Sequence, residues 1–324
     1  MTTTVAESIT GWDATLDVAR VKHAFSPAAA AEVRRFLAAQ PVLDRLARVQ
    51  QIEEIPLDRA PLPNFLRDVR AMEHEARHGL RFVVAEAVPG LTLAQQMAVP
   101  WVMSQALGRT LAQNEAGHRF YIIADRGGKM ELGARYSQTS QGGSFHTDGV
   151  NVKEGYDFFL LSCVAPAAEG GESILLDGHT VYRDLCDHAP HVLPALQRER
   201  VWEYKGVRPG EFYREPILKL IEGRPVWRYL RDYIEEAARK QSEPVDADSR
   251  AAMDRLDAAL GNPAFQFRYT LRAGETAIVN DRCVFHGRTP FRDAPGAVSI
   301  EQRLAGGHDA ALLGRTYSRF WVNP

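Results

Sequence analysis

Two residues in the segment Ser144–Gly149 carry side chains that could bind a metal together. Residues two apart on an extended strand face the same side, so His146 and Asp148 place an imidazole and a carboxylate on one face. With a second, distant histidine they would form a facial set of three ligands, which leaves positions of ferrous iron open for a co-substrate and dioxygen. On its own, such a pair is more often a hydrogen-bonded surface or core pair.

A second histidine that fits this set lies far downstream, in the segment Gly274–Phe291. An apolar run, a turn and a further apolar run predict two strands that deliver His286 into the mouth of a barrel. A single histidine in an apolar stretch is usually a satisfied core residue. Together, the two segments point to a metal site more strongly than either does alone.

A competing motif is His74-Glu75-Ala76-Arg77-His78, which fits His-Glu-x-x-His. On a helix this spacing places two imidazoles one turn apart to bind zinc, with the glutamate as general base. Gly79 follows at once, so His78 would lie in the last turn of the helix, and charged residues on a helix face are usually solvated. No third ligand stands at a matching spacing in the sequence.

The elements that must position these residues change along the chain. From Ser26 to about Leu111 the apolar residues mostly recur at helical spacing, with a break at Pro41. Two helical insertions are expected further on, over about Thr180–Arg198 and Asp246–Leu260. Beyond Arg119 short β-type runs prevail, namely Phe120–Ala124, Phe158–Val164, Ser173–Leu176, Val201–Tyr204, Ile217–Ile221, Val226–Tyr229, Phe265–Leu271, Ala277–Val279 and Tyr317–Val322.

This order of elements predicts the fold class. Helices followed by many strands do not alternate as βαβ units do, so a parallel sheet is disfavoured. The order favours a β-rich α+β protein with a double-stranded β-helix, or jelly-roll, core, a helical N-terminal jacket and helical insertions. We expect a helix-rich region over residues 1–114, packed on a catalytic core over residues 115–324 as one integrated domain.

Composition narrows the class of partner. The 324 residues are 45% hydrophobic and 25% charged, which is typical of a soluble globular protein. The net charge of −2 and the absence of a basic cluster argue against a nucleic-acid partner. The sequence has no run of about 18 apolar residues, so no membrane span is predicted. Cys163, Cys186 and Cys283 are too few for a disulfide framework, so we expect a cytoplasmic protein. The balanced charge leaves a small-molecule substrate as the expected partner. Homo-oligomerisation stays open.

The motifs resemble the TauD/TfdA family of iron(II)- and 2-oxoglutarate-dependent oxygenases, whose pattern is His-x-Asp, a remote His and a later Arg. The stretch His146–Gly178 with its Gly-Gly-Glu-Ser, and Asn280–Phe291 with its His-Gly-Arg-Thr, look especially like the γ-butyrobetaine and trimethyllysine hydroxylase branch. The resemblance covers roughly residues 115–324. It implies Fe(II), 2-oxoglutarate and O2 as cofactor and co-substrates, and hydroxylation that releases succinate and CO2.

The resemblance also implies roles for particular residues. His146, Asp148 and His286 would be the iron ligands. In the family a Thr or Ser follows the Gly-Gly pair and donates to the distal carboxylate of 2-oxoglutarate, and Ser173 occupies that place. An ordinary strand hydroxyl is the alternative interpretation of Ser173.

The same carboxylate calls for an arginine, because a planar guanidinium makes two parallel hydrogen bonds to it. The segment Gly314-Arg315-Thr-Tyr-Ser-Arg319 looks like the closing strand of the family, so Arg315 is expected to bind 2-oxoglutarate. Arg319, further along the same face, is expected to help bind that ligand or to hold a substrate carboxylate. Arg303 is the rival, because the stretch before Arg315 is longer than in the family and is a candidate flap over the site.

The segment Val150–Asp157 is a candidate substrate loop, in which Asn151 and Tyr156 would contact substrate. A solvated connection between strands is equally consistent with it. A betaine substrate would need an aromatic cage, for which the scattered aromatics are Tyr136, Tyr156, Trp202, Tyr204, Trp227 and Tyr229. We expect hydroxylation of a small amino acid or a related carboxylate or betaine in specialised metabolism. The alternatives are a zinc-dependent peptidase and a non-catalytic jelly-roll ligand-binding protein.

Overall fold

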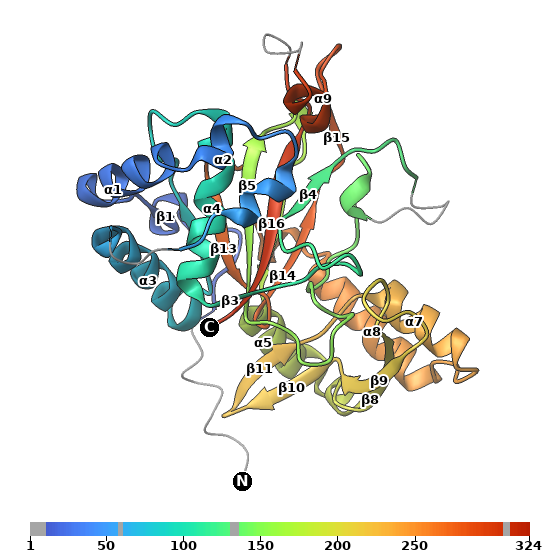
Figure 1. Ribbon diagram of the computed structural model, residues 1–324. Helices are drawn as coiled ribbons and strands as arrows, with labels where there is room; N and C mark the ends of the chain where they lie inside the picture. Colours follow the sequence, from blue (N-terminus) through green and yellow to red (C-terminus); the bar gives the residue numbers. More distant parts are fainter. Residues whose placement is uncertain (1–10, 58–60, 130–135, 307–311) are drawn as a thin grey trace.

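A computed structural model describes residues 11–57, 61–129, 136–306 and 312–324, and two facing sheets form its centre (Figure 1). The major sheet has the strand order β1 (Lys22–His23), β2 (Phe82–Ala85), β13 (Thr276–Asn280), β5 (Phe158–Ala165), β16 (Thr316–Asn323) and β3 (Arg109–Leu111), with β4 (Tyr121–Ala124) also paired to β16. The minor sheet has the order β12 (Gln266–Tyr269), β7 (Ser173–Asp177) and β14 (Val284–Arg288). Apart from the parallel pair β1–β2, these pairs are antiparallel.

Alternation along the strands gives the major sheet two different faces. On β2, Phe82 and Val84 point into a cluster that also holds residues of the minor sheet, whereas Val83 and Ala85 point to the helices outside. The β5 sequence is apolar at nearly every position, which is typical of a strand covered on both faces. The space between the two sheets is therefore lined by one face of each.

The helices before residue 108 cover the outer face of the major sheet (Figure 1, blue to teal). They are α1 (Pro27–Ala38), α2 (Pro41–Asp44), α3 (Pro63–His78) and α4 (Leu93–Leu107). Thr92 caps α4 by accepting from the Gln95 amide, and most of this helix is apolar because it is buried against β5 and β16. This layer supports the sheet from behind.

Insertions cover the outer face of the minor sheet, where Ile174 and Leu176 join a second cluster. The insertions contain the helices α5 (Gly178–His188), α6 (Leu193–Leu196), α7 (Arg231–Lys240) and α8 (Ala247–Leu260), and the hairpins β8 (Glu199–Glu203) with β9 (Phe212–Pro216) and β10 (Leu218–Ile221) with β11 (Arg224–Trp227). The other end of the sheets, away from these hairpins, carries a short strand pair and a short helix (Figure 1). They are β6 (Glu169–Gly170) with β15 (Phe291–Arg292), and α9 (Ile300–Leu304).

The predicted strands beyond Arg119 correspond to strands of the structure, with small shifts at their ends. Three strands, β1, β2 and β3, fall within the part expected to be helix-rich, and β2 pairs with β13 in the centre of the major sheet. The run Phe82–Ala85 is too short for its period to be read, so its pairing with β13 decides its conformation. None of the described helices is long and apolar enough to cross a membrane.

Candidate metal centre and active-site cavity

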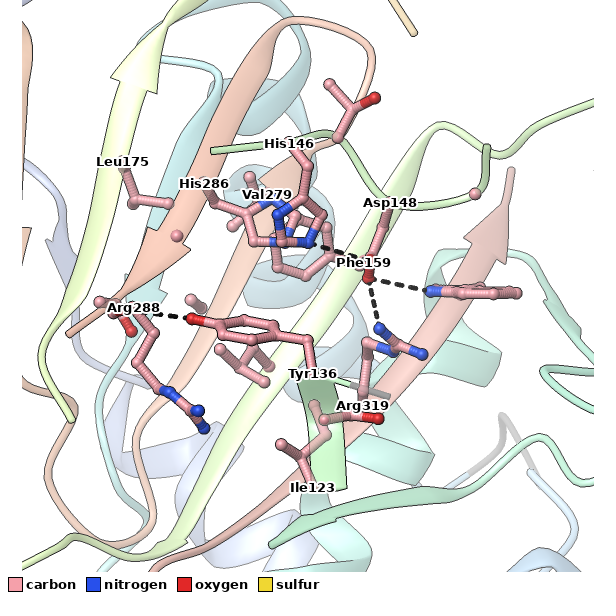
Figure 2. A pocket seen from close by; sticks show the side chains of 18 of the residues that line it. Ile123, Tyr136, His146, Asp148, Phe159, Leu175, Val279, His286, Arg288 and Arg319 are labelled. Carbon is pink, nitrogen blue, oxygen red and sulfur yellow. Dashed lines mark hydrogen bonds and ion pairs between the residues drawn. The ribbon is translucent and has the colours of Figure 1, made fainter. Parts of the chain in front are cut away.

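Two of the predicted ligands are fixed to each other through the main chain. The His146 amide donates to the His286 carbonyl at 3.0 Å, and the His286 amide donates to the His146 carbonyl at 2.9 Å, so the two residues form an isolated antiparallel bridge beside β14. Their rings lie 4.4 Å apart, centroid to centroid. A β-bridge thus places two imidazoles from distant segments at the inner face of the minor sheet (Figure 2).

The surroundings of both imidazoles suit metal binding. The Nδ1–H of His146 donates to the Ser144 carbonyl at 2.9 Å, which leaves the lone pair of Nε2 for a metal. His286 packs against the ring of Phe159, with 4.6 Å between centroids. Burial, and then the neighbouring His146, lower the pKa of His286 to about 3, so its ring is uncharged at neutral pH.

Asp148 completes the group, and its two oxygens have different surroundings. Oδ2 accepts from Arg319 Nη1 at 2.7 Å and from Trp321 Nε1 at 3.4 Å, whereas Oδ1 lies 3.7 Å from His146 Nε2 (Figure 2). Burial opposes ionisation of Asp148, but the charge of Arg319 outweighs it and lowers the pKa of the carboxyl. The carboxylate therefore keeps one oxygen for a metal.

Among the residues that the structure describes, His146, Asp148 and His286 are the group whose ligand atoms are close enough to hold a metal ion, all within 4.8 Å of one another. The donor set of two imidazoles and one carboxylate fits ferrous iron with open coordination positions. The His-Glu-x-x-His motif makes no such group: Glu75 Oε1 accepts from the Leu80 amide beyond the end of α3, and His74 and His78 are exposed.

The metal group lies in the wall of a cavity between the two sheets, and buried cations lie in the same wall. Arg315, directly before β16, is 3% exposed, and its Nε and Nη1 have no partner among the described residues. Its guanidinium lies over the rings of Tyr317, at 4.0 Å, and Phe291, at 4.9 Å. Burial lowers the pKa of Arg315 to about 10, which still leaves it charged at neutral pH.

The other residues predicted for co-substrate or substrate lie at different places. Ser173 lines the cavity on β7, opposite Arg288 of β14 in the strand register. Arg319 lines it too, but it is engaged with Asp148 and donates through Nε to Gln113 Oε1 at 2.8 Å. Arg303 is in α9 and is not part of the described lining.

The candidate substrate loop divides between two environments. Asn151 lines the cavity, where its Nδ2 donates to the Lys205 carbonyl at 2.9 Å. Tyr156 is buried behind Asp148, stacked on Trp321 with 4.8 Å between the ring centroids, and it borders a separate cleft. The turn from Val152 to Gly155 lies between the two residues and separates them: the Gly155 amide donates to the Val152 carbonyl at 3.2 Å, and Gly155 has a φ of 62°.

Three residues of the site were not singled out from the sequence. Gln113, which is 2% exposed, holds Arg319 in place. Arg288 donates through Nη2 to the carbonyls of Thr139 and Gln141, and its Nε has no partner among the described residues. Asp281 accepts from the Asp148 amide at 2.8 Å, and burial together with the charge of Asp148 raises the pKa of Asp281 well above its ordinary value.

For Arg288 a signal was available in the sequence, since it stands two residues after His286 and shares its strand face. Gln113 and Asp281 carry no such pattern. In its described part, residues 292–306 and 312–314, the segment between Phe291 and Arg315 folds away from the cavity: Ile300 of α9 is fully buried among the side chains of the N-terminal helical layer, and Glu301 pairs with Arg126 at 2.6 Å. Residues 307–311 of the expected flap lie outside the described residues.

Comparison with known proteins decides the family. The model of the "Taurine catabolism dioxygenase TauD, TfdA family" matches residues 49–303. The chain belongs to this family. The TauD/TfdA match begins within the N-terminal helical layer, before the roughly 115–324 covered by the motifs. It supports the family as a whole, and the finer resemblance to the γ-butyrobetaine and trimethyllysine hydroxylase branch stays a prediction.

Relatives of known identity cover most of the chain. FR-33289 synthase of Streptomyces rubellomurinus is 27% identical over 277 residues, which is 83% of this chain and 75% of that protein. Asparagine oxygenase, solved with Fe(II), hydroxyasparagine and succinate, has a TM-score of 0.66 at 19% identity and covers 94% of this chain and 93% of its own. The oxygenase OrfP, solved with Fe and α-ketoglutaric acid, has a TM-score of 0.60 at 15% identity, with 93% and 94% covered.

These likenesses confirm the fold class predicted from the sequence, a jelly-roll core with added helices, although the strands described here do not close into a barrel. As a TauD/TfdA member the chain is a non-haem iron oxygenase that uses Fe(II), 2-oxoglutarate and O2. The residues present fit these groups. The three ligand side chains suit the iron, and the N–H groups of Arg315 that have no partner among the described residues suit a carboxylate.

Proposed function

We propose that the chain hydroxylates a C–H bond of a small amino acid or a related carboxylate, with conversion of 2-oxoglutarate to succinate and CO2. The observation that carries the proposal is one cavity lined by both parts of such a site. His146, Asp148 and His286 offer three ligand atoms within 4.8 Å of one another, and Arg315 in the same lining offers buried N–H donors that no other residue of the described ranges engages.

In this proposal His146, Asp148 and His286 hold the iron. Arg315 pairs with the distal carboxylate of 2-oxoglutarate through two parallel hydrogen bonds, and Ser173 donates a third from the facing sheet. Because the guanidinium of Arg315 lies over two aromatic rings, its plane is already oriented before the ligand arrives. Less conformational entropy is therefore lost on binding.

The charge of the cavity favours an anionic substrate. Among the described lining residues the carboxylate is Asp148, and the cations are Lys205, Arg288, Arg315 and Arg319. The two positive charges of ferrous iron would balance the two negative charges of 2-oxoglutarate. Lys205 is paired with Glu236 at 2.5 Å, but the arginines of the lining still outnumber Asp148, so positive charge remains to attract the substrate. We place a substrate carboxylate beside Arg319 and Asn151, on the part of the lining not assigned to 2-oxoglutarate.

The aromatic residues do not by themselves separate the two substrate classes. A quaternary ammonium group would need an aromatic cage at the cavity. Of the six aromatics considered from the sequence, Tyr136 lines the cavity, but Tyr121, Tyr233, Tyr269 and Trp321 line it as well. The preference for a free amino acid or related carboxylate over a betaine therefore rests on the excess of cations in the described lining. The solved relatives with hydroxyasparagine and with (3S)-hydroxy-L-Arg agree with an amino acid.

Bound iron, with 2-oxoglutarate and dioxygen, supplies the oxidising power for the reaction. The chain supplies orientation and a dry environment. Phe159, Leu175 and Val279 line the cavity and limit the water at the metal (Figure 2). Asp148 presents a single oxygen because Arg319 and Trp321 occupy the other, and this leaves room for the co-substrate.

The proposal is tested by anaerobic titration of the apoprotein with Fe(II) and 2-oxoglutarate, following the visible charge-transfer band of the chelate. The band is expected in the wild type and in His78→Ala, and it should be lost in Asp148→Ala. Succinate release is then followed across a panel of amino acids, matched carboxylates and betaines. A band that survives Asp148→Ala but not His78→Ala would refute the assigned metal site. Turnover of betaines alone would refute the substrate class.

A further inference from the structure

The segment that carries His146 and Asp148 is held by main-chain hydrogen bonds at each of its three residues. His146 pairs with His286 of β14, as described above. The Thr147 amide donates to the Tyr229 carbonyl at 2.8 Å, and the Tyr229 amide donates to Thr147 Oγ1 at 3.0 Å. The Asp148 amide, by contrast, donates to a side chain, Oδ1 of Asp281, at 2.8 Å.

Asp281 lies in the turn between β13 and β14, just ahead of the strand that carries His286. It is 5% exposed, and its own amide donates to the Asp157 carbonyl at 3.0 Å. The next residues of the turn are anchored as well, because the carbonyls of Arg282 and Cys283 accept from the amides of Trp227 and Gly178 at 2.9 and 2.8 Å. The acceptor is therefore carried by a well-supported turn.

We propose that Asp281 is a positioning residue for the metal centre: its carboxyl oxygen fixes the main chain of Asp148 relative to the strand of His286. The inference rests on the proposed role of Asp148 as a ligand. Arg319 and Trp321 donate hydrogen bonds to Oδ2 of the Asp148 side chain, and Asp281 accepts one from the Asp148 amide. Together they set where Oδ1 lies with respect to the two imidazoles. Without the acceptor the part-buried amide of Asp148 loses its partner, and the segment can shift.

The test uses the full-length apoprotein and Co(II), whose visible absorption reports binding without turnover. Asp281→Ala removes the acceptor, and Asp281→Asn keeps an oxygen at the same place. Glu32→Ala is the matched control, because Glu32 is also a buried carboxylate that accepts from main-chain amides, those of Asn64 and Phe65, but in the N-terminal helical layer. Thermal unfolding of each apoprotein records any general loss of stability.

Loss of a residue that orients a metal ligand typically weakens metal binding about 10- to 100-fold, so we expect a change of this size in Asp281→Ala. Asp281→Asn should stay close to the wild type, and Glu32→Ala should lower the unfolding temperature without changing Co(II) affinity. If Asp281→Ala does not fold, Asp281→Glu takes its place, because one added methylene displaces the acceptor and should also weaken binding.

Wild-type Co(II) affinity in Asp281→Ala, or in Asp281→Glu where that variant is used, would overturn the inference. An equal loss of Co(II) affinity in Asp281→Asn and Asp281→Ala would also overturn it, because the effect on metal binding would then come from the carboxyl group itself and not from an acceptor oxygen at this place. Failure of the proposed function has a different signature. In that case the wild type itself would not bind Co(II), or His146→Ala would bind it as well as the wild type does.

Discussion

Replacing Arg315 is the sharpest test of how the cavity binds 2-oxoglutarate. The guanidinium is buried with Nε and Nη1 unpartnered among the described residues, and it lies against the rings of Tyr317 and Phe291. Arg315→Lys keeps the charge but loses one of two parallel hydrogen bonds. Arg315→Ala loses both bonds and the charge.

The expected loss of binding free energy for 2-oxoglutarate follows from the two hydrogen bonds of the guanidinium. A hydrogen bond to a charged group contributes about 1.5–3 kcal/mol, so the lysine variant should lose at least about 1.5 kcal/mol of binding free energy. This corresponds to roughly a tenfold weaker affinity for 2-oxoglutarate. The alanine variant should lose at least about 3 kcal/mol, or roughly a hundredfold. Neither change should lower the stability of the apoprotein much, because a buried cation without a partner is itself unfavourable.

The assay is anaerobic titration of the Fe(II)-loaded protein with 2-oxoglutarate, followed by the charge-transfer band, with thermal unfolding of each apoprotein beside it. Arg303→Ala is the control, because Arg303 is the other arginine that the sequence offers for 2-oxoglutarate and it is outside the described lining of the cavity. An equal or larger loss of affinity in Arg303→Ala would refute the reasoning, and so would a lysine variant that binds like the wild type.

Two further predictions concern glycine and buried charge. Gly171 has a φ of +73°, and a Cβ there would meet Arg315 Nε at 2.9 Å, whereas Gly127 has a φ of +71° with nothing within 4 Å. Each Gly→Ala change should cost about 1–2 kcal/mol of folding free energy, but only Gly171→Ala should also weaken 2-oxoglutarate binding, and equal binding in both variants would contradict this. Asp177 is fully buried and pairs with Arg81 Nε at 2.8 Å. Asp177 also accepts from the amides of Trp12 and Thr180, so Asp177→Ala should lower the free energy of unfolding in urea by about 3–5 kcal/mol, and a loss below about 1 kcal/mol would contradict this.

Much of the site could be anticipated from the sequence because its chemistry is local. The spacing of His146 and Asp148, and the apolar runs around His286, are properties of short segments, and the structure brings these three residues into one group. The order of helices and strands likewise indicated a jelly-roll core rather than a parallel sheet. In each case a period of two residues or a run of apolar residues carried the information.

Other features depended on which distant segments meet. Tyr156 and Asn151 are five positions apart in one predicted loop, yet the turn from Val152 to Gly155 between them places Tyr156 behind Asp148 and leaves Asn151 in the cavity. Arg303 and Arg315 could not be ranked from spacing, because the inserted segment makes their distance along the chain uninformative. In the structure, α9 packs on the helical layer and Arg315 lies in the cavity.

The sequence by itself thus determined the types of ligand, most of the strands and the class of chemistry, because those follow from residue identity and short-range period. Only the tertiary structure decided the partners of each charge. Asp148 is held by Arg319, Trp321 and Asp281, which come from β16 and from the turn before β14. These contacts arise because β5 pairs with both β13 and β16, and such long-range pairing is fixed by the packing of whole sheets.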